Sequence, residues 1–591
     1  MRKTVVRRAH PRPQFIRESW QLLDGEWGFS FDDKKIGIEK RWFNGFESTH
    51  QIKVPFTYET KLSGIFDSSH HQVVWYQKKI QINEKKAKSI LFEGVDYFSQ
   101  VWLNGHLIGA HQGAYERFEF ELSDFLVEGE NLIVVRVEDS LACEQPRGKQ
   151  RWLKDNFGCW YIQTTGIWKS VWIEDHLHSQ RLQQVKMTPD FENDQIIFEP
   201  SLHDRVAARD ATYELEIDVS FEEVLVNQCR VTLSHEMQQI TLDTRIKEDA
   251  CWGTKVWRPE QPNLYDVTFR LWDHQGQLVD CVDSYFGMRK ISIEKGQVLL
   301  NNQKIYQRLI LDQGYWAESG ITPPSIEAME KDIDQILALG YNGLRKHQKV
   351  EDERFLYLCD EKGVLVWSEM ASTYVFNDLA VENFTDEWRA IVQQNYNHPS
   401  IITWVPFNES WGIKGVKSDK KQQQFTEMIY HLTKTIDPNR PVITNDGWVH
   451  TISDILTLHD YEEFGERFTN RYKDKEKITG NEYQFNEEWY AFADGYEYTG
   501  QPVIISEFGG IAFTSNEKEN WGYGSQVNTQ DDFLKRFDKI HESIQKIPYL
   551  VGYCYTQLTD VEQEINGLLD VNRTSKLPVS RIREINERRT R

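Results

Sequence analysis

The sequence predicts two β-sandwiches followed by a (β/α)8 barrel. Three observations support this fold class: alternating strand patterns over residues 1–178, a second strand-rich stretch over 179–288, and buried runs that alternate with amphipathic segments over 289–591. A chain of 591 residues is long enough for about three or four domains. We therefore expect a jelly-roll domain, an immunoglobulin-like domain and a TIM-barrel domain within these three ranges.

The first range contains short strand-like runs separated by turn signals. "VVWYQKKIQI" (73–82) and "NLIVVRVED" (131–139) are typical of sandwich strands. Asn104-Gly105 lies between two alternating runs, and this dipeptide predicts a tight hairpin. Strands of this length with frequent turns favour a sandwich of the jelly-roll kind.

The second range has the length and pattern of an immunoglobulin-like sandwich. It spans close to the roughly 100 residues that such a domain needs. "YELEIDVSF" (213–221) and "YDVTFRLWD" (265–273) alternate apolar and polar residues. The two prolines of "WRPEQPNLY" (257–265) confine that stretch to a turn or a sheet edge.

In the third range, strand-like and helix-like patterns alternate, as in a (β/α)8 barrel. Pro323 and Pro324 precede "SIEAMEKDI", and they predict that a helix begins there. The strand-like runs are "YQRLILD", "YNGLRK", "GVLVWSEM", "IITWVPFNE", "PVITND", "ILTLHDY", "PVIISEFGG" and "LVGYCYTQLTD".

The composition and charge of the chain indicate which partners and which location to expect. A net charge of −22 argues against binding of nucleic-acid phosphates over a broad surface. The basic "MRKTVVRR" is not followed by an apolar segment, and no run approaches the ~18 apolar residues of a membrane span. The seven cysteines are scattered, which indicates reduced thiols and a cytoplasmic location. The histidines lack metal-ligand spacing, so we expect no structural zinc. We also expect no metal or nucleotide cofactor.

Two carboxylates follow buried runs of the predicted barrel. Glu409 ends the fourth strand and Glu507 ends the seventh. Active sites of such barrels lie at the carboxyl ends of the strands, and paired carboxylates there are the groups that hydrolyse glycosidic bonds. An isolated Glu at a strand end is more often paired with a barrel Arg, but two at matched positions favour catalysis.

At these residues the chain resembles glycoside hydrolase family 2. "NHPSIITWVPFNESWG" (397–412) is similar to the acid/base segment of that family, and "PVIISEFGG" (502–510) to its nucleophile strand. The likeness extends to "VWRPEQPNLY" and "FGMRKISIE" at the end of the second domain. The resemblance implies retaining, exo-acting hydrolysis of β-linked sugars by these three domains. It makes Glu409 the acid/base, Glu507 the nucleophile, and Asn408 the residue that binds the sugar 2-hydroxyl.

The two roles place different demands on the surroundings. Glu409 needs a raised pKa to act as an acid, and nearby aromatic residues, including Trp411, can supply desolvation. Glu507 must stay ionised, and Arg345 and Tyr461 are candidate donors for it. Arg345 could instead be a structural pair of the barrel floor, and Tyr461 an ordinary aromatic of the rim.

The loop "RKHQKV" (345–350) departs from the family pattern. The family His position falls on Gln348, since His347 is one residue early. We expect the substrate to be bound by Asn408, Arg345, Tyr461, Gln348 and Trp411. Lys346 and Lys349 are either solvated surface charges or ligands of a substrate carboxylate or hydroxyl.

Two further differences fall in the sugar pocket. A family Trp position falls at Thr556, and the Asn-x-Lys motif of β-glucuronidases is absent near "EINGLL".

The sequence thus predicts an exo-acting retaining β-glycosidase, most like β-galactosidases. β-Glucuronidase, β-mannosidase and β-galactofuranosidase activities are the alternatives on the same scaffold. A non-catalytic carbohydrate-binding protein is the alternative of another class, but both Glu residues are present. We expect a carbohydrate as substrate and no nucleic acid or membrane as partner, with a homo-oligomer as a possible assembly.

Overall fold

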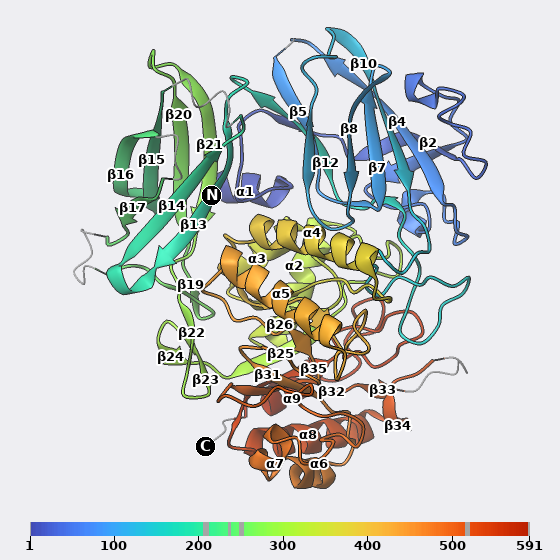
Figure 1. Ribbon diagram of the computed structural model, residues 1–591, viewed down its shortest axis with the longest axis vertical. Coiled ribbons are helices and arrows are strands. Elements are labelled where there is room, and N and C mark those ends of the chain that lie inside the picture. Colours follow the sequence, from blue (N-terminus) through green and yellow to red (C-terminus); the bar gives the residue numbers. More distant parts are fainter. Residues whose placement is uncertain are drawn as a thin grey trace.

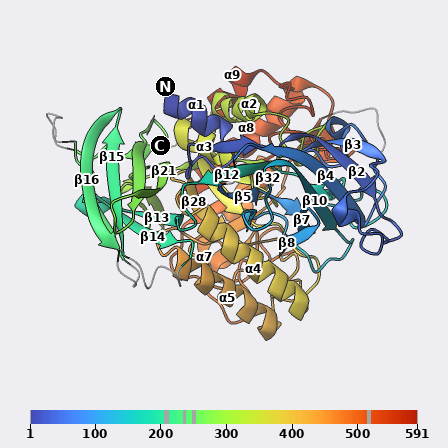
Figure 2. The ribbon, with the colours of Figure 1, turned by 90° about the horizontal axis from the view of Figure 1, so that it is seen from above.

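The computed structural model describes residues 2–84, 86–204, 212–233, 238–246, 253–513 and 520–588. Two β-sandwiches lie side by side at one end, and the barrel forms the other end (Figure 1). Seen from above, the sandwiches flank the helices of the barrel on opposite sides (Figure 2). This architecture confirms the predicted fold class. Across the described ranges, every helix is too short or too polar to span a bilayer.

The first sandwich packs a six-stranded sheet, β3-β2-β4-β10-β7-β8, against a four-stranded sheet, β1-β12-β5-β9. The predicted hairpin joins β7 to β8, and Asn104 and Gly105 both have positive φ (50° and 82°), as the tightest hairpin turns require. Helix α1 (Arg2–Ala9) precedes the strands. The strands are β1 (Trp20–Leu22), β2 (Gly25–Phe31), β3 (His50–Val54), β4 (Val73–Ile82), β5 (Ala87–Phe92), β6 (Val95–Asp96), β7 (Phe98–Leu103), β8 (His106–Gln112), β9 (Phe118–Glu121), β10 (Gly129–Glu138), β11 (Gly166–Ile167) and β12 (Val171–His176).

The second sandwich packs the sheet β13-β14-β17 against the sheet β16-β15-β20-β21. Burial alternates along β15, so its apolar residues face the other sheet. The proline-rich stretch forms a separate antiparallel pair, β18–β19, with a two-residue turn between the strands. The strands are β13 (Leu182–Asp190), β14 (Gln195–Leu202), β15 (Tyr213–Phe221), β16 (Val224–Leu233), β17 (Ile240–Asp243), β18 (Trp257–Arg258), β19 (Gln261–Pro262), β20 (Tyr265–Trp272) and β21 (Leu278–Phe286).

Parallel strands form the barrel, in the order β28-β27-β26-β25-β35-β32-β31. The short pair β29–β30 and a parallel bridge between Trp404 and Val442 supply the fifth strand position. A small sheet of β22 (Ile291–Glu294), β23 (Gln297–Leu300) and β24 (Gln303–Lys304) precedes the barrel. The barrel strands are β25 (Gln307–Asp312), β26 (Gly343–Lys346), β27 (Leu365–Glu369), β28 (Ile401–Val405), β29 (Phe407–Asn408), β30 (Asn445–Asp446), β31 (Leu456–His459), β32 (Val503–Gly509) and β35 (Leu550–Thr556).

Helices cover the outside of the barrel. The predicted helix start is confirmed, because the Ser325 hydroxyl accepts a hydrogen bond from the Ala328 amide at the beginning of α2. The pair β33 (Ile511–Phe513) and β34 (Tyr523–Val527) lies beyond β32. The helices are α2 (Ile326–Ala338), α3 (Glu353–Lys362), α4 (Asp378–Gln394), α5 (Lys420–Ile436), α6 (Gly465–Tyr472), α7 (Lys475–Thr479), α8 (Gln530–Lys546) and α9 (Val579–Asn586).

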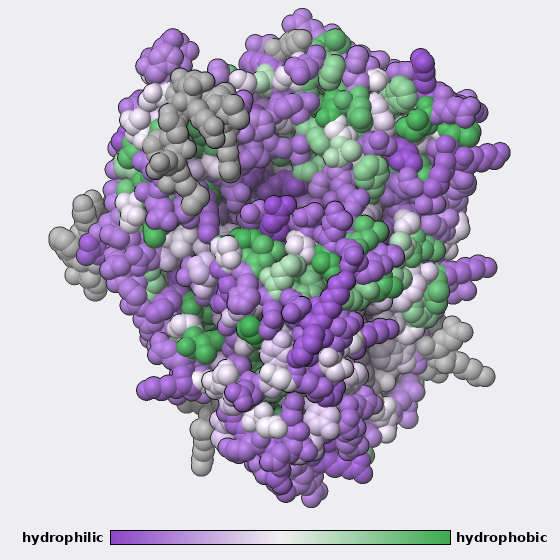
Figure 3. Space-filling model, viewed as in Figure 1, coloured by the Kyte–Doolittle hydropathy of each residue, from purple (hydrophilic) through white to green (hydrophobic). Residues whose placement is uncertain are grey.

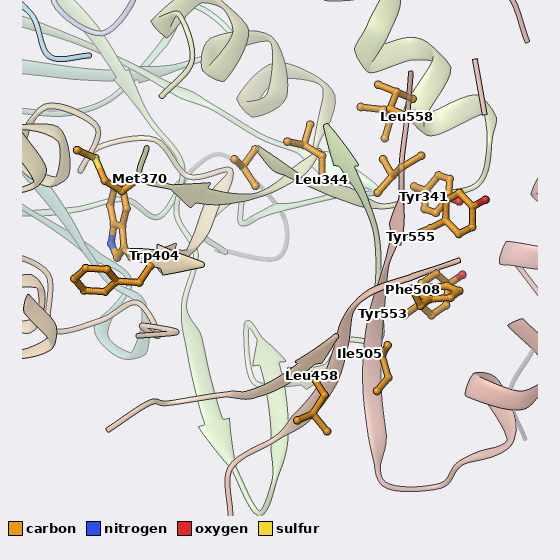
Figure 4. Close-up of a cluster of buried hydrophobic side chains, with 14 of the residues drawn as sticks. Tyr341, Leu344, Met370, Trp404, Leu458, Ile505, Phe508, Tyr553, Tyr555 and Leu558 are labelled. Atoms are coloured by element: carbon orange, nitrogen blue, oxygen red, sulfur yellow. The ribbon is translucent and has the colours of Figure 1, made fainter. Parts of the chain in front are cut away.

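The barrel strands have two buried faces. Leu344, Leu458 and Ile505 belong to the apolar layer between the strands and the helices (Figure 4). Leu309 and Trp367 belong to a separate cluster that fills the inside of the barrel. Successive residues of a strand point to opposite faces, so position along the strand decides which side chains reach the interior.

A loop of the first sandwich lies on the rim of the barrel. The Arg147 amide donates to the Ser372 carbonyl (2.9 Å), and the Tyr374 hydroxyl donates to the Gly148 carbonyl. Gly148 has φ +58°, and a Cβ atom there would lie 2.3 Å from the backbone oxygen of Gln348. The close approach of the two backbones therefore requires glycine at this position.

On the face shown in Figure 3, polar residues predominate, and apolar patches lie near the middle, where Figure 1 shows α4 and α5, and over the first sandwich. The six described cysteines are free, in agreement with the predicted reduced thiols.

Candidate active site

The two predicted catalytic carboxylates meet at the carboxyl ends of the barrel strands. A carboxylate oxygen of Glu409 lies within 4.8 Å of one of Glu507. Glu409 adopts a left-handed conformation (φ 49°), and its amide donates to the Asp446 carbonyl (2.9 Å). This turn directs the Glu409 side chain from the end of β29 into the mouth of the barrel. Carboxyl groups about 5–5.5 Å apart are typical of retaining glycosidases, and wider spacings are typical of inverting ones.

Arg345 lies inside the barrel and contacts the polar side chains of the site. Its Nη1 donates to Glu507 Oε1 (2.8 Å) and is paired with Asp446 Oδ2 (2.7 Å). Its Nε donates to Glu369 Oε2 (2.6 Å), and its Nη2 to Asn408 Oδ1 (2.6 Å). The guanidinium is fully buried and thus balances several carboxylates that burial alone would destabilise.

Asn408 keeps one amide donor free. Its oxygen accepts from Arg345, so its Nδ2 is turned away from the guanidinium. This nitrogen is buried and has no hydrogen-bond partner within the described ranges. A buried donor without a partner is costly in a folded protein, and a sugar hydroxyl would satisfy it.

Both candidate donors contact Glu507. The Tyr461 hydroxyl donates to Glu507 Oε2 and also lies 3.2 Å from Thr556 Oγ1. Burial raises the pKa of Glu507, but the charges of His459 and Arg345 and the Tyr461 hydrogen bond together hold it below its usual range. Glu507 is therefore held ionised, as a nucleophile must be.

His459 was not predicted from the sequence, although it ends the sixth strand, where catalytic residues belong. Its Nδ1 lies 2.8 Å from Glu409 Oε1, and its Nε2 lies 3.1 Å from Asp446 Oδ2. Burial lowers the pKa of His459, but the charges of Glu507 and Asp446 raise it to about 10. Glu409, His459 and Glu507 could surround a small cation, but His459 and Arg345 already balance these carboxylates, so we do not assign them as metal ligands.

Gln348 lies beside the site, and both polar atoms of its side-chain amide form hydrogen bonds within the protein. Its Nε2 donates to Glu369 Oε1 (2.8 Å), and its Oε1 accepts from the Ser372 amide (2.8 Å). His347 also contacts Glu369 (2.9 Å), so both residues brace the carboxylate that holds Arg345. Substrate binding by Gln348 stays a prediction.

Lys346 and Lys349 are not solvated surface charges, because both are buried in ion pairs within the protein. Lys346 is buried and paired with Asp312 (2.5 Å) and Glu351 (3.0 Å), and Lys349 is buried and paired with Glu351 (2.8 Å). For Lys346 the reason is the pleat of β26: Arg345 points into the barrel, so Lys346 points outward to the layer below the helices.

An aromatic wall borders the site beside Glu409. Trp411 lies 5.7 Å from Trp160 of the sandwich loop and 5.9 Å from Tyr374, measured between ring centroids. Lys149, on the same loop as Trp160, is buried, and its Nζ lies 4.9 Å from the ring centroid of Trp411. Burial lowers the pKa of Lys149, but Cys159, Glu564 and Glu507 raise it overall. Sequence reasoning missed Lys149, because its loop has no periodic pattern.

Family models match the chain in three consecutive segments. Residues 20–176 match "Glycosyl hydrolases family 2, sugar binding domain" and residues 180–289 match "Glycosyl hydrolases family 2". Residues 291–588 match "Glycosyl hydrolases family 2, TIM barrel domain". Together the matches cover nearly the whole chain.

The curated relatives are named for different glycosidase activities. A putative beta-glucuronidase of Formosa agariphila is 28% identical over 62% of this chain and 44% of its own length. A beta-galactosidase of Thermoanaerobacter pseudethanolicus is 24% identical over 85% of this chain and 67% of its own length. The chain thus spans less than half of the first relative and about two thirds of the second.

Solved structures share the fold over the whole chain. A beta-galacturonidase from Eisenbergiella tayi bound to galacturonate has a TM-score of 0.75 at 20% identity, with 97% of this chain and 98% of that chain covered. A b-glucuronidase from Ruminococcus gnavus in complex with D-glucuronic acid has a TM-score of 0.77 at 16% identity, with the same coverage. At these identities the likeness establishes the fold.

Proposed function

The chain belongs to family 2 of the glycosyl hydrolases, and from that premise we propose that it is an exo-acting, retaining β-glycosidase. The observation that carries this proposal is the spacing of Glu409 and Glu507, whose carboxylate oxygens lie within 4.8 Å across the barrel mouth. At that spacing Glu507 can bond directly to the anomeric carbon. An inverting enzyme would need a wider separation, to admit a water molecule between the base and the sugar.

In the first step, Glu507 attacks the anomeric carbon and the bond to the leaving oxygen breaks. Glu409 gives its proton to that oxygen as it departs. Arg345 and Tyr461 orient the attacking carboxylate, because they contact its two oxygens. The free Nδ2 of Asn408 is placed to donate to a hydroxyl of the sugar, and such a bond lowers the barrier if it strengthens in the transition state.

In the second step, a water molecule attacks the anomeric carbon and the bond to Glu507 breaks. Glu409 now accepts the proton of the water, so one residue serves as acid and then as base. The configuration of the sugar is inverted twice and is therefore retained. Nuclear magnetic resonance of the first product formed is the direct measurement of this outcome.

For the sugar, we propose a β-galactoside as the first candidate, supported by the overall family resemblance and by the names of several relatives. A β-linked uronide is the second candidate, and Lys149 is the observation that favours it. Its buried ammonium contacts an aromatic face and a thiol near Glu507, where a carboxylate of the substrate could pair with it. The relatives named for glucuronide and galacturonide support this alternative.

A panel of aryl β-glycosides tests both candidates. We expect turnover of one sugar, and we expect Glu507→Gln to abolish it. If the substrate is a uronide, Lys149→Met should reduce its kcat/KM by about 10- to 160-fold, which corresponds to the loss of about 1.5–3 kcal/mol expected for a hydrogen bond to a charged group. Lys88, which is equally buried but paired with Asp175 in the first sandwich, provides the matched control Lys88→Met. The lack of turnover on every sugar of the panel would contradict the proposal.

We also propose a cytoplasmic location. The free cysteines support it, because unpaired thiols are typical of reducing compartments.

A further inference from the structure

His459 lies between three carboxylates at the centre of the site. Its Nδ1 is 2.8 Å from Glu409 Oε1 and 3.7 Å from Glu507 Oε2, and its Nε2 is 3.1 Å from Asp446 Oδ2. A neutral imidazole has one N–H donor, and an imidazolium has two. Because both ring nitrogens face carboxylate oxygens, the doubly protonated ring suits this environment.

The backbone and its neighbours fix the orientation of the ring. Gly447 has φ +109°, and a Cβ atom there would lie 2.7 Å from His459 Nδ1, so the ring lies directly against this glycine. Trp448 packs edge-on against it, with ring centroids 5.6 Å apart. The Asn486 side chain donates to the His459 carbonyl (3.0 Å). The imidazole therefore has little freedom to turn away from the carboxylates.

We propose that His459 is a positioning residue that couples the proton affinity of Glu409 to the charge on Glu507. This inference rests on the proposed glycosidase function. It assigns no contact with the sugar to His459, which acts through the two carboxylates.

The reaction moves one negative charge between the two neighbours of Nδ1. When the bond from Glu507 to the anomeric carbon forms, Glu507 loses its charge, and Glu409 gains one as its proton passes to the leaving oxygen. The total charge beside the imidazolium is unchanged, but it moves from the oxygen at 3.7 Å to the oxygen at 2.8 Å. His459 therefore stabilises Glu507 as a carboxylate at rest and Glu409 as a carboxylate in the intermediate. The second step, in which Glu409 takes a proton from water, reverses the transfer.

The other charged groups around His459 stay constant during this transfer. Asp446 anchors Nε2 and is itself paired with Arg345 (2.7 Å). Tyr461 bonds to Glu507, and the buried His450 faces the Thr457 carbonyl (2.8 Å). The ring itself faces Glu409 from the end of β29, Asp446 from β30 and Glu507 from β32, and the other titratable or charged groups nearby are Arg345 from β26, Tyr461 after β31 and His450 before it.

The pH profile of His459→Asn tests the coupling. Removal of a cation raises the pKa of a neighbouring carboxyl group, by about 1–3 units for a partner this close. The acid limb of kcat/KM reports ionisation of Glu507 and the basic limb reports protonation of Glu409. Both limbs should therefore move to higher pH by at least about 1 unit. His450→Asn is the matched control, because it removes an equally buried ring that contacts a carbonyl oxygen.

A profile that keeps both limbs in place in His459→Asn, or that moves equally in His450→Asn, would overturn the proposal. Purely structural damage would lower kcat at every pH without this shift.

A second measurement does not depend on activity. In the wild-type chain labelled with ¹⁵N-histidine, the His459 signals are those lost in His459→Asn and shifted in Glu409→Gln, so assignment does not depend on one variant folding. We expect both ring nitrogens to be protonated at neutral pH. A neutral ring would refute the inference even if the glycosidase activity is found, and a doubly protonated ring without turnover of any sugar would refute only the proposed activity.

Discussion

Tyr461→Phe removes one oxygen from the site and leaves the ring stacked on Tyr523, with centroids 3.4 Å apart. The lost hydroxyl donates to Glu507 Oε2. Glu507 recovers its negative charge when the covalent intermediate breaks down, so this hydrogen bond strengthens in the second step. A hydrogen bond to a charged group contributes about 1.5–3 kcal/mol, which corresponds to a loss of about 10- to 160-fold in kcat.

The first step should respond differently. There the carboxylate loses charge, so kcat/KM for an activated aryl glycoside should fall less than kcat, and the covalent intermediate should accumulate. Loss of a donor to the ionised form also raises the pKa of Glu507, so the acid limb of kcat/KM should move to higher pH.

Stopped-flow release of the aryl group is the assay. We expect a burst of about one equivalent per active site in Tyr461→Phe, followed by slow turnover. Tyr523→Phe is the control, since it keeps the stack and removes a hydroxyl that does not contact Glu507 in the described ranges. An unchanged kcat without a burst would refute the assignment of Tyr461 to the nucleophile.

Three other predictions follow from the same geometry. Glu507→Ala should abolish turnover, and azide should restore part of it with a product of inverted configuration; a rate near that of wild type would exclude Glu507 as the nucleophile. Glu409→Ala should slow a disaccharide far more than a nitrophenyl glycoside, and equal losses would argue against an acid role. Lys346→Ala should lower the free energy of unfolding by about 3–5 kcal/mol, because it removes the cation paired with the buried Asp312 carboxylate and leaves Glu351 with Lys349 alone. The ranking of sugars should stay unchanged in that variant, and a changed ranking with wild-type stability would contradict the buried pairing.

The fold and the two carboxylates could be predicted because they depend on local patterns. Buried runs that alternate with amphipathic segments indicate a barrel, and the end of a strand indicates the mouth. The same rule applies to His459, which ends its strand in "ILTLHDY" as plainly as Glu507 ends its own. Its role was missed because one histidine next to an aspartate has many structural explanations in a sequence.

Lys346 and Lys149 show that a residue's position in the sequence must be combined with the geometry of its strand or loop. Lys346 follows Arg345 on a strand, so the two side chains cannot both enter the barrel. This alternation, which the sequence pattern contains, is enough to exclude Lys346 from the sugar pocket. Lys149 could not have been found this way, because its approach to Trp411 joins a loop of the first sandwich to the barrel, far along the chain.

The loop that carries Gly148 and Lys149 joins the first sandwich to the rim of the barrel, so a change in one domain affects the other. The barrel holds the proposed catalytic pair, but a loop of the first sandwich lies on its rim and places Lys149 against Trp411. Exchange of the barrel between homologues would therefore separate the two carboxylates from the loop that packs on the rim beside them. A substitution in the sandwich that shifts this loop by the width of one methyl group would press on the Gln348 carbonyl, and so on the residues that orient the nucleophile. The two domains must therefore stay compatible at this contact.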